Sequence, residues 1–202
     1  MKRISLLILC MVLFCSVVNA KSIDSVSKIS SNVPKIAVVL AGDKNMISEE
    51  RIIKEIDKQI EKKFPENKYN VIKDNKVYQE LLIVAEDHNV VNLDQLKRDD
   101  FINAGEKFGY DYVIVLPFYN EGGQYTTTGW TNIISQNITL RARIVDVKTQ
   151  EYLYRIDVTK QGEAGNGFGS PSPQRAQKEA ISKCLNEVFK DLTIGEKYEV
   201  QK

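Results

Sequence analysis

Histidine and cysteine are scarce in this sequence, which has one histidine and three cysteines among 202 residues. A serine or cysteine nucleophile needs a base within hydrogen-bond reach, and nothing in the sequence around His88 suggests such a pair. A metal site generally needs several ligands, of which histidine and cysteine are common ones. We therefore expect no catalytic residues, no metal site and no cofactor, and we predict that the protein is not an enzyme.

A hydrophobic run long enough to cross a membrane is also absent. The apolar stretch at residues 4–18 has 15 residues, whereas a membrane-spanning helix needs about 20. It follows Lys2 and Arg3 and precedes Ala20, which is the pattern of a secretory signal peptide cleaved after Ala20. An uncleaved anchor is the alternative. Neither cysteine in this stretch follows the small residue that lipid attachment requires, so we expect no lipidation.

The sequence has no excess of charge of one sign. Removing residues 1–20 removes two of the 28 basic side chains and none of the 27 acidic ones, which leaves a net charge of −1. Nucleic-acid binding generally needs a concentrated positive surface, so we expect no nucleic-acid partner and, after cleavage, no membrane span. Only Cys184 remains in the shortened chain, which excludes an intrachain disulfide.

Composition divides the rest of the chain into three parts. Residues 21–33 are rich in Ser, Lys and Asn and predict a flexible leader. Residues 34–194 carry periodic apolar positions and have the length of a single α/β domain. Residues 195–202 are mostly charged and predict a frayed tail. Cys184 lies among apolar residues and predicts a small buried side chain, with an intermolecular disulfide as the alternative.

The first half of the domain alternates strand and helix patterns. Residues 35–41, KIAVVLA, form a short apolar run that is typical of a strand covered on both faces. Ser48 can cap the helix that follows, and Phe64-Pro65 ends it. The next expected elements are a strand at residues 68–72, a helix from residue 74 or 75 to about 88, and a helix at residues 94–108 that Gly109 ends in the left-handed conformation.

The second half predicts an antiparallel meander of three strands. The first covers residues 112–119, where Pro117 lacks the N–H of a ladder hydrogen bond and predicts an edge strand or a bulge. Alternating apolar residues predict the other two strands at 138–145 and 152–158, joined by a tight turn at 147–150.

A last helix is expected between Ser172, whose hydroxyl can cap it, and Gly195. The order of the elements is then β-α-β-α-α-β-β-β-α. The predicted fold class is α/β (α+β): a single mixed sheet whose last three strands form an antiparallel meander, with helices packed on the sheet.

Two motifs carry a resemblance to known proteins. Residues 105–115, GEKFGYDYVIV, resemble an "alanine…leucine-glycine-alanine-aspartate-tyrosine-valine" motif that leads into a sheet. Residues 143–151, RIVDVKTQE, resemble an "arginine-hydrophobic-valine-aspartate-x-lysine-threonine-glycine-glutamate" hairpin, with Gln150 in place of the turn glycine. Over residues 35–192 the chain resembles a superfamily of bacterial envelope proteins. This superfamily includes the curli-secretion channel subunit, the activator lipoproteins of penicillin-binding proteins and the amino-terminal domain of the Tol–Pal propeller protein.

The resemblance implies work through protein contacts in the envelope, in assembly, secretion or regulation, and not an enzymatic activity. The channel subunits carry long transmembrane hairpins after the third and fifth strands, where this sequence has residues 120–132 and 162–172. Membrane-spanning strands need about 9–11 residues each. Neither segment is expected to supply such a hairpin, so the channel function is not carried over.

The same two segments are the expected loops at one edge of the sheet, since the ends of the third and fifth strands of a meander lie together. Tyr125 and Trp130 in the first segment and Phe168 in the second are the partner-binding candidates. Rigid aromatic side chains on small polar loops give contact area at low ordering cost. The alternative is that Trp130 folds back onto the sheet.

The sequence thus predicts an exported, non-enzymatic module, periplasmic or associated with the cell envelope, that acts through contacts with envelope proteins. One alternative is a ring-forming oligomer related to the secretion-channel subunits but without their membrane hairpins. Another is a small-molecule binder or an enzyme that uses the loop edge of the sheet.

Overall fold

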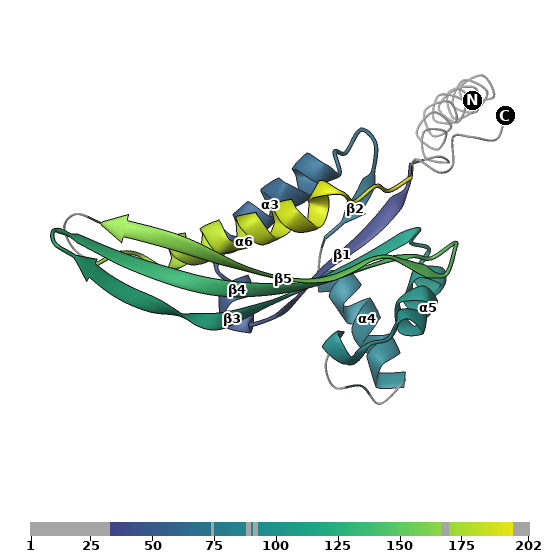
Figure 1. Ribbon diagram of the computed structural model, residues 1–202. Helices are drawn as coiled ribbons and strands as arrows, with labels where there is room; N and C mark the ends of the chain where they lie inside the picture. The colour runs from purple at the N-terminus through teal and green to yellow at the C-terminus, as the bar shows by residue number, and fades with distance from the viewer. Residues whose placement is uncertain (1–32, 74, 88–89, 91–92, 167–169, 196–202) are drawn as a thin grey trace, which may run out of the picture. The chain divides into compact units, whose positions relative to one another are not determined.

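The computed structural model of the protein describes residues 33–73, 75–87, 90, 93–166 and 170–195 (Figure 1). The expected signal peptide, residues 21–32 of the expected leader, His88, Phe168 and the tail from residue 196 lie outside the described residues. The bounds of the leader, the domain and the tail therefore stay predictions.

Strands and helices alternate in the first half of the described chain, and three long strands and a helix form the second half. In chain order the elements are β1 (Lys35–Gly42), α2 (Lys44–Ile47), α3 (Glu50–Lys63), β2 (Asn70–Ile72), α4 (Asn75–Asp87), the 3₁₀ turn η1 (Leu93–Gln95), α5 (Arg98–Phe108), β3 (Tyr112–Thr128), β4 (Thr131–Asp146), β5 (Glu151–Asn166) and α6 (Pro173–Lys190).

One five-stranded sheet in the order β2-β1-β3-β4-β5 organises these elements. β1 is parallel to β2 and to β3, and long connections that contain helices join them. β3, β4 and β5 form an antiparallel meander joined by tight turns. Figure 1 shows α3 and α6 on one face of the sheet and α4 and α5 on the other. The predicted fold class, a single mixed sheet with helices packed on it, is confirmed.

Apolar side chains fill both faces of the central strands. Alternate residues of a strand point to opposite faces, so Ile36 and Val38 pack in the cluster of α3 and α6. Ala37 and Val39 pack in the cluster of α4 and α5. All four side chains are at most 3 % exposed. This burial on two sides explains the continuous apolar run in the sequence of β1.

Two helix starts differ from the sequence prediction. Ser48 does not cap α3: it follows α2, its hydroxyl donates to the carbonyl oxygen of Asn45 at 3.3 Å, and α3 begins at Glu50. The helix expected at residues 94–108 is divided into η1 and α5. At the start of α5 the Asp100 carboxylate accepts the backbone N–H of Lys97 at 2.7 Å. Several polar side chains can satisfy the free N–H groups of a helix start, so the sequence pattern did not single out the correct start.

The predicted helix ends are correct at Gly109 and wrong at Gly195. Gly109 has φ +71° and caps α5 in the left-handed conformation. α6 begins as predicted, with Pro173 in its first turn and the Ser172 hydroxyl accepting the backbone N–H of Arg175 at 3.4 Å. It ends already at Lys190. Gly195 has φ +86°, but in the segment beyond the helix.

β3 is a central strand, so the prediction of an edge strand at Pro117 is wrong. Pro117 pairs with Ala41 of β1, and the register between β3 and β4 is the same before and after it. The irregularity in the register lies further on, between Asn120 and Gly123. Gly122, with φ +94°, provides the left-handed backbone that such a bulge favours.

The turn between β4 and β5 lies at residues 147–150, as predicted. One carboxylate oxygen of Asp146 accepts the backbone N–H groups of Lys148 at 2.9 Å and Thr149 at 3.1 Å. Gln150 has φ +59°, in the left-handed region that favours glycine. The hairpin motif of the sequence therefore corresponds to a real turn, with glutamine in the position of the motif's glycine.

Candidate functional site

The three strands of the meander continue well past their predicted ends. We call their outer part the distal arm, and it consists of residues 123–128 of β3, 131–136 of β4 and 162–166 of β5. Thr127 pairs with Asn132, and Asn132 pairs in turn with Asn166. The arm is therefore a three-stranded sheet almost to its tip.

The loop expected at residues 120–132 is thus wrong over most of its length, and residues 162–166 of the loop expected at residues 162–172 belong to β5. Their Gly, Thr and Asn content suggested loops, but strand pairing satisfies the backbone whatever the side chains are. Thr, Tyr and Ile also suit a strand well. The expectation that the two segments emerge at the same edge of the sheet is correct, and β4 lies between them.

A two-residue turn, Gly129-Trp130, closes the arm between the paired residues Thr128 and Thr131. Gly129 has φ +56° and Trp130 does not have a positive φ. Glycine at the first central position is the pattern of a type II′ hairpin turn. The Thr127 hydroxyl donates to the Asn132 side-chain oxygen at 3.0 Å just below the turn. The turn therefore presents Trp130 at a defined place.

Two of the three predicted partner-binding residues lie exposed on this arm. The Trp130 side chain is 88 % exposed and the Tyr125 side chain 57 %. Trp130 does not fold back onto the sheet, so that alternative is wrong. Tyr125 pairs with Ile134, which pairs with Ala164, so the three side chains form a row across one face of the arm. Phe168 lies outside the described residues, and its role stays a prediction.

α6 holds the base of the arm. A β-carbon at Gly162 would lie 2.0 Å from the carbonyl oxygen of Ala176, so only glycine permits this approach of β5 and α6. The Glu179 carboxylate accepts the backbone N–H of Glu163 at 2.9 Å. Figure 1 shows α6 lying along the sheet. The arm is therefore a braced extension of the fold.

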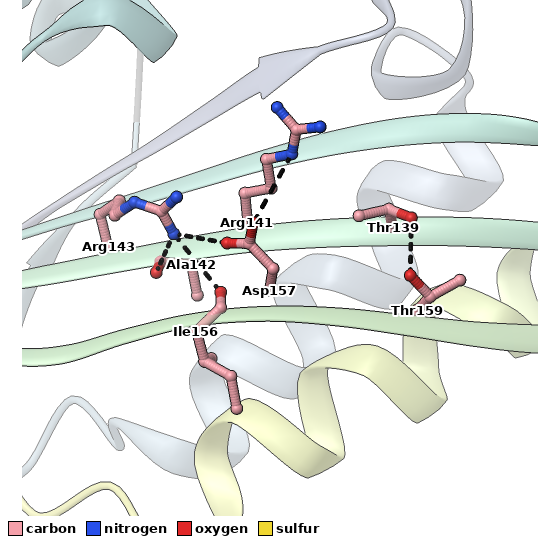
Figure 2. Close-up of polar contacts among 7 residues, drawn as sticks. All are labelled: Thr139, Arg141, Ala142, Arg143, Ile156, Asp157 and Thr159. Carbon is pink, nitrogen blue, oxygen red and sulfur yellow. Dashed lines mark hydrogen bonds and ion pairs between the residues drawn. The ribbon is translucent and has the colours of Figure 1, made fainter.

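The sheet face opposite α6 is polar next to the arm (Figure 2). An Arg143 Nη1 donates to the Asp157 carboxylate at 2.9 Å, and the Arg141 Nε lies 3.9 Å from the other oxygen of that carboxylate. The hydroxyls of Thr139 and Thr159 are 2.8 Å apart and form a hydrogen bond across the strands. One carboxylate thus neutralises part of the charge of two arginines.

The Arg141 guanidinium also lies over the ring of Tyr119, 4.8 Å from its centre. The alternation along β4 puts both arginines on one face, but the sequence pattern does not indicate their acidic partner. Asp146 pairs with Glu151 next to the turn. If the register stayed the same along both strands from this pair, Ile156 would lie opposite Arg141. A bulge between Ile144 and Val145 shifts the register by one residue and puts Asp157 there. The bulge leaves no clear signal in the sequence.

Cys184 is buried and does not form a reactive thiol site. Its side chain is fully buried, and its sulfur lies 3.4 Å from the carbonyl oxygen of Ile138 and 3.6 Å from that of Val158. Burial raises the pKa of the Cys184 thiol to about 11. A neutral, inaccessible thiol is a poor nucleophile, and an intermolecular disulfide would require this part of the fold to open.

The described residues contain neither a candidate metal site nor a candidate membrane-spanning helix. No group of three or more His, Cys, Asp or Glu side chains is placed to hold a metal ion there. No helix within the described ranges combines the length and the apolar character needed to cross a membrane.

The fold and the arm together define a class: an α+β protein with one mixed sheet and a projecting three-stranded arm. Neither a protein-family model nor a curated protein sequence matches the chain. Solved structures do match, and the three described next have TM-scores below 0.5.

Lipoprotein GNA1162 from Neisseria meningitidis has 13 % sequence identity and a TM-score of 0.42, and the match covers 78 % of this chain and 99 % of that one. The LpoB C-terminal domain from Salmonella enterica has 12 % identity and a TM-score of 0.32, with 64 % of this chain and 86 % of that one covered. TolB from Acinetobacter baumannii has 15 % identity and a TM-score of 0.31, with 78 % of this chain and 28 % of that one covered.

At these identities and TM-scores the three matches do not establish a superfamily, and the bacterial envelope superfamily expected from the sequence stays a prediction. Identities and scores at this level establish no function. The link to the curli-secretion channel subunit stays a prediction.

Proposed function

We propose that the protein is an exported, non-enzymatic module of the bacterial cell envelope that acts through contacts with other envelope proteins, in assembly, secretion or regulation. Export is supported by the basic residues, the apolar run and Ala20 at the amino terminus, which lie outside the described residues. The envelope setting is supported by the hairpin motif at residues 143–151, whose aspartate, Asp146, accepts two backbone N–H groups of the turn.

The observation that carries the proposal is the exposed indole of Trp130 at the tip of a braced arm. An aromatic side chain of this kind buries roughly 200 Å² in an interface, which corresponds to a gross apolar gain of about 5 kcal/mol at 25 cal/mol per Å², before the costs of association are subtracted. The paired strands order the backbone beforehand, so less conformational entropy is lost on binding. Tryptophan and tyrosine are also the residues most often found at the energetic centre of protein interfaces.

Site-specific photo-crosslinking in living cells tests this function. A photoreactive phenylalanine analogue replaces Trp130 or Tyr125, and a matched control carries it at Lys58, an exposed position on α3. We expect discrete adducts with envelope proteins from the arm positions and none from Lys58, identified by mass spectrometry. Trp130→Ala should remove the adducts formed at Tyr125 and change the free energy of unfolding by less than about 1 kcal/mol, as surface substitutions usually do. Equal adducts from all three positions, or none from the arm, would contradict the proposal.

A ring-forming oligomer is the second candidate, and the outer edge of β5 is the observation that favours it. β5 ends the sheet, and in the described part of the chain no strand pairs with its outer side. Unpaired edges are templates for association with another chain. Near the arm, however, the Lys183 amine donates to the carbonyl oxygen of Gln161 at 3.0 Å and occupies part of that edge. Sedimentation at increasing concentration separates the two candidates, because a monomer throughout would contradict the ring.

A further inference from the structure

A cavity of about 610 Å³ lies beside β1, on the side away from β3. It is lined by Val38, Val39 and Leu40 of β1, by Lys44 and Ile47 of α2, by Ile53, Asp57 and Ile60 of α3, and by Lys73, Asn75 and Tyr78 at the start of α4. Its volume is in the range of sites that bind ligands in proteins.

The cavity lies where β2 stops short. β2 has three residues and pairs only with Lys35–Ala37, whereas β1 continues to Gly42 and stays paired with β3 as far as Phe118. Within the described ranges, the second half of β1 therefore has a strand partner on one side only. About five residues of β1, or roughly 16 Å at 3.3 Å per residue, lie along this open edge.

The hydrogen bonds at the start of β1 show which backbone groups face this edge. Asn70 of β2 donates its N–H to the Pro34 carbonyl at 2.9 Å, so Pro34 faces β2. Asp111, next to β3, donates to the Lys35 carbonyl at 2.9 Å, so Lys35 faces the other way. Successive residues of a strand alternate in this respect. The N–H groups of Leu40 and Gly42 therefore point to the open edge.

The walls of the cavity suit the side chains of an added strand. α3 and α4 lie on opposite faces of the sheet (Figure 1), so a strand beside β1 would direct alternate side chains toward Ile53 and toward Tyr78. Charge lies at the border of the cavity. Lys73 is paired with Asp57 at 3.0 Å and with Glu61 at 3.1 Å. Lys44 is exposed, and no acidic partner is seen for it among the described residues.

We propose that this groove binds an extended peptide segment of a partner protein, which adds to the open edge of β1 as a strand. The main-chain groups of the peptide pair with Leu40 and Gly42, and its apolar side chains alternate between the two walls. An acidic residue or a terminal carboxylate of the peptide pairs with Lys44. The groove is distinct from the distal arm, so the inference does not depend on what the arm binds.

The leader of this chain fits the groove less well than such a peptide. Its apolar residues Ile23, Val26 and Ile29 recur every third position. In a strand, positions three apart point to opposite faces, so a five-residue segment that contains two of these residues places only one apolar side chain on each wall, fewer than a mostly apolar peptide does. A second copy of the chain is the other rival occupant.

Amide hydrogen exchange of the full chain tests the open edge directly. We expect the N–H groups of Leu40 and Gly42 to exchange at least tenfold faster than those of Val39 and Ala41, which face β3. Equal protection of all four in the free chain would overturn the proposal. If the Leu40 and Gly42 amides are protected and this protection disappears when Ile23, Val26 and Ile29 are replaced by serine, the leader occupies the groove. Protection that rises with protein concentration would assign it to a second copy.

Selection of random octapeptides on the full chain tests the occupant, with Ile53→Glu as the variant that blocks one wall. We expect enriched peptides with short runs of consecutive apolar residues, whose side chains reach both walls. These peptides should bind at least tenfold more weakly to Ile53→Glu and should protect the Leu40 and Gly42 amides. Ile83→Glu, on an exposed part of α4, and Trp130→Ala are controls that should change binding less than about twofold. N-methylation of the peptide amides that face β1 should abolish binding. N-methylation of the amides on the opposite edge of the peptide should leave binding intact. Enriched peptides that bind Ile53→Glu as tightly as the wild type, or no enrichment at all, would overturn the proposal.

Discussion

Gln150 is the one residue other than glycine with a positive φ in the described part of the chain. A side chain in the left-handed region costs roughly 1–2 kcal/mol relative to glycine. The Gln150 amide recovers part of this through a long contact of 3.3 Å with the exposed Glu106 carboxylate. We therefore predict that Gln150→Gly stabilises the protein by about 0.5–1 kcal/mol. Urea unfolding, followed by circular dichroism, measures the shift in the midpoint.

The matched control for this prediction is the neighbouring residue Thr149, whose φ is not positive. Thr149→Gly should destabilise the protein, because glycine there only adds conformational freedom to the unfolded chain. If both substitutions shift the midpoint in the same direction, the φ angle of Gln150 is not the cause.

Some residues with one physical reason were predicted well from the sequence, whereas Ser48, Pro117 and Gly195 were not. Gly109 had to end a helix, Pro173 had to begin one, and Gln150 was recognised by the motif in which it replaces glycine. The position of Asp157 opposite Arg141 could not be predicted, because it depends on a bulge that shifts the register by one residue. Such a shift results from the packing of the whole sheet and has no local code.

At the scale of elements, a buried polar contact joins α3 to α6. The Glu55 carboxylate, 7 % exposed, accepts from Gln59 at 2.9 Å and lies 3.3 Å from the Lys178 amine. Gln59 also donates to the Ser182 hydroxyl at 3.0 Å. Burial raises the pKa of Glu55, but the hydrogen bonds from Gln59 and Lys178 outweigh it and hold this pKa below its ordinary value.

We predict that Glu55→Gln destabilises the protein by about 1–2 kcal/mol at pH 7, the usual range for a hydrogen-bonded charge with a partly exposed partner. Because the folded state lowers the pKa of Glu55, the stabilisation is present above the pKa of the unfolded chain, about 4.3. It is lost as the pH falls through the lower pKa of the folded state. Urea midpoints of the wild type and the variant should therefore converge between about pH 5 and pH 3.

Glu50→Gln provides the control on the same helix. Glu50 forms an exposed pair with Lys54, so its replacement should change the unfolding free energy by less than about 0.5 kcal/mol. If the difference in urea midpoint between the wild type and Glu55→Gln stays constant down to pH 3, the charge of Glu55 is not involved.

At the scale of the whole molecule, the sequence predicted the topology and missed the length of the strands. The apolar alternation that predicts a strand stops near residue 119, since beyond it the meander leaves the buried core. The strands continue because three of them pair with one another and because Gly162 lets α6 approach β5. The groove beside β1 was missed for a similar reason: it results from the different lengths of β1 and β2, which no single segment encodes.

A shortened arm separates the role of the tip from that of the fold. Replacing residues 126–133 by Asn-Gly joins the paired residues Tyr125 and Ile134 through a two-residue turn of a favoured type. The eight residues removed are exposed or partly exposed, so we predict a change in the unfolding free energy of less than about 2 kcal/mol, measured by thermal and urea unfolding. The same variant should lose the envelope-protein adducts formed from Tyr125 while it still binds the peptides selected on the groove of β1. If it fails to fold, the tip is a structural element; if it folds and keeps the adducts, Trp130 is not the centre of the interface.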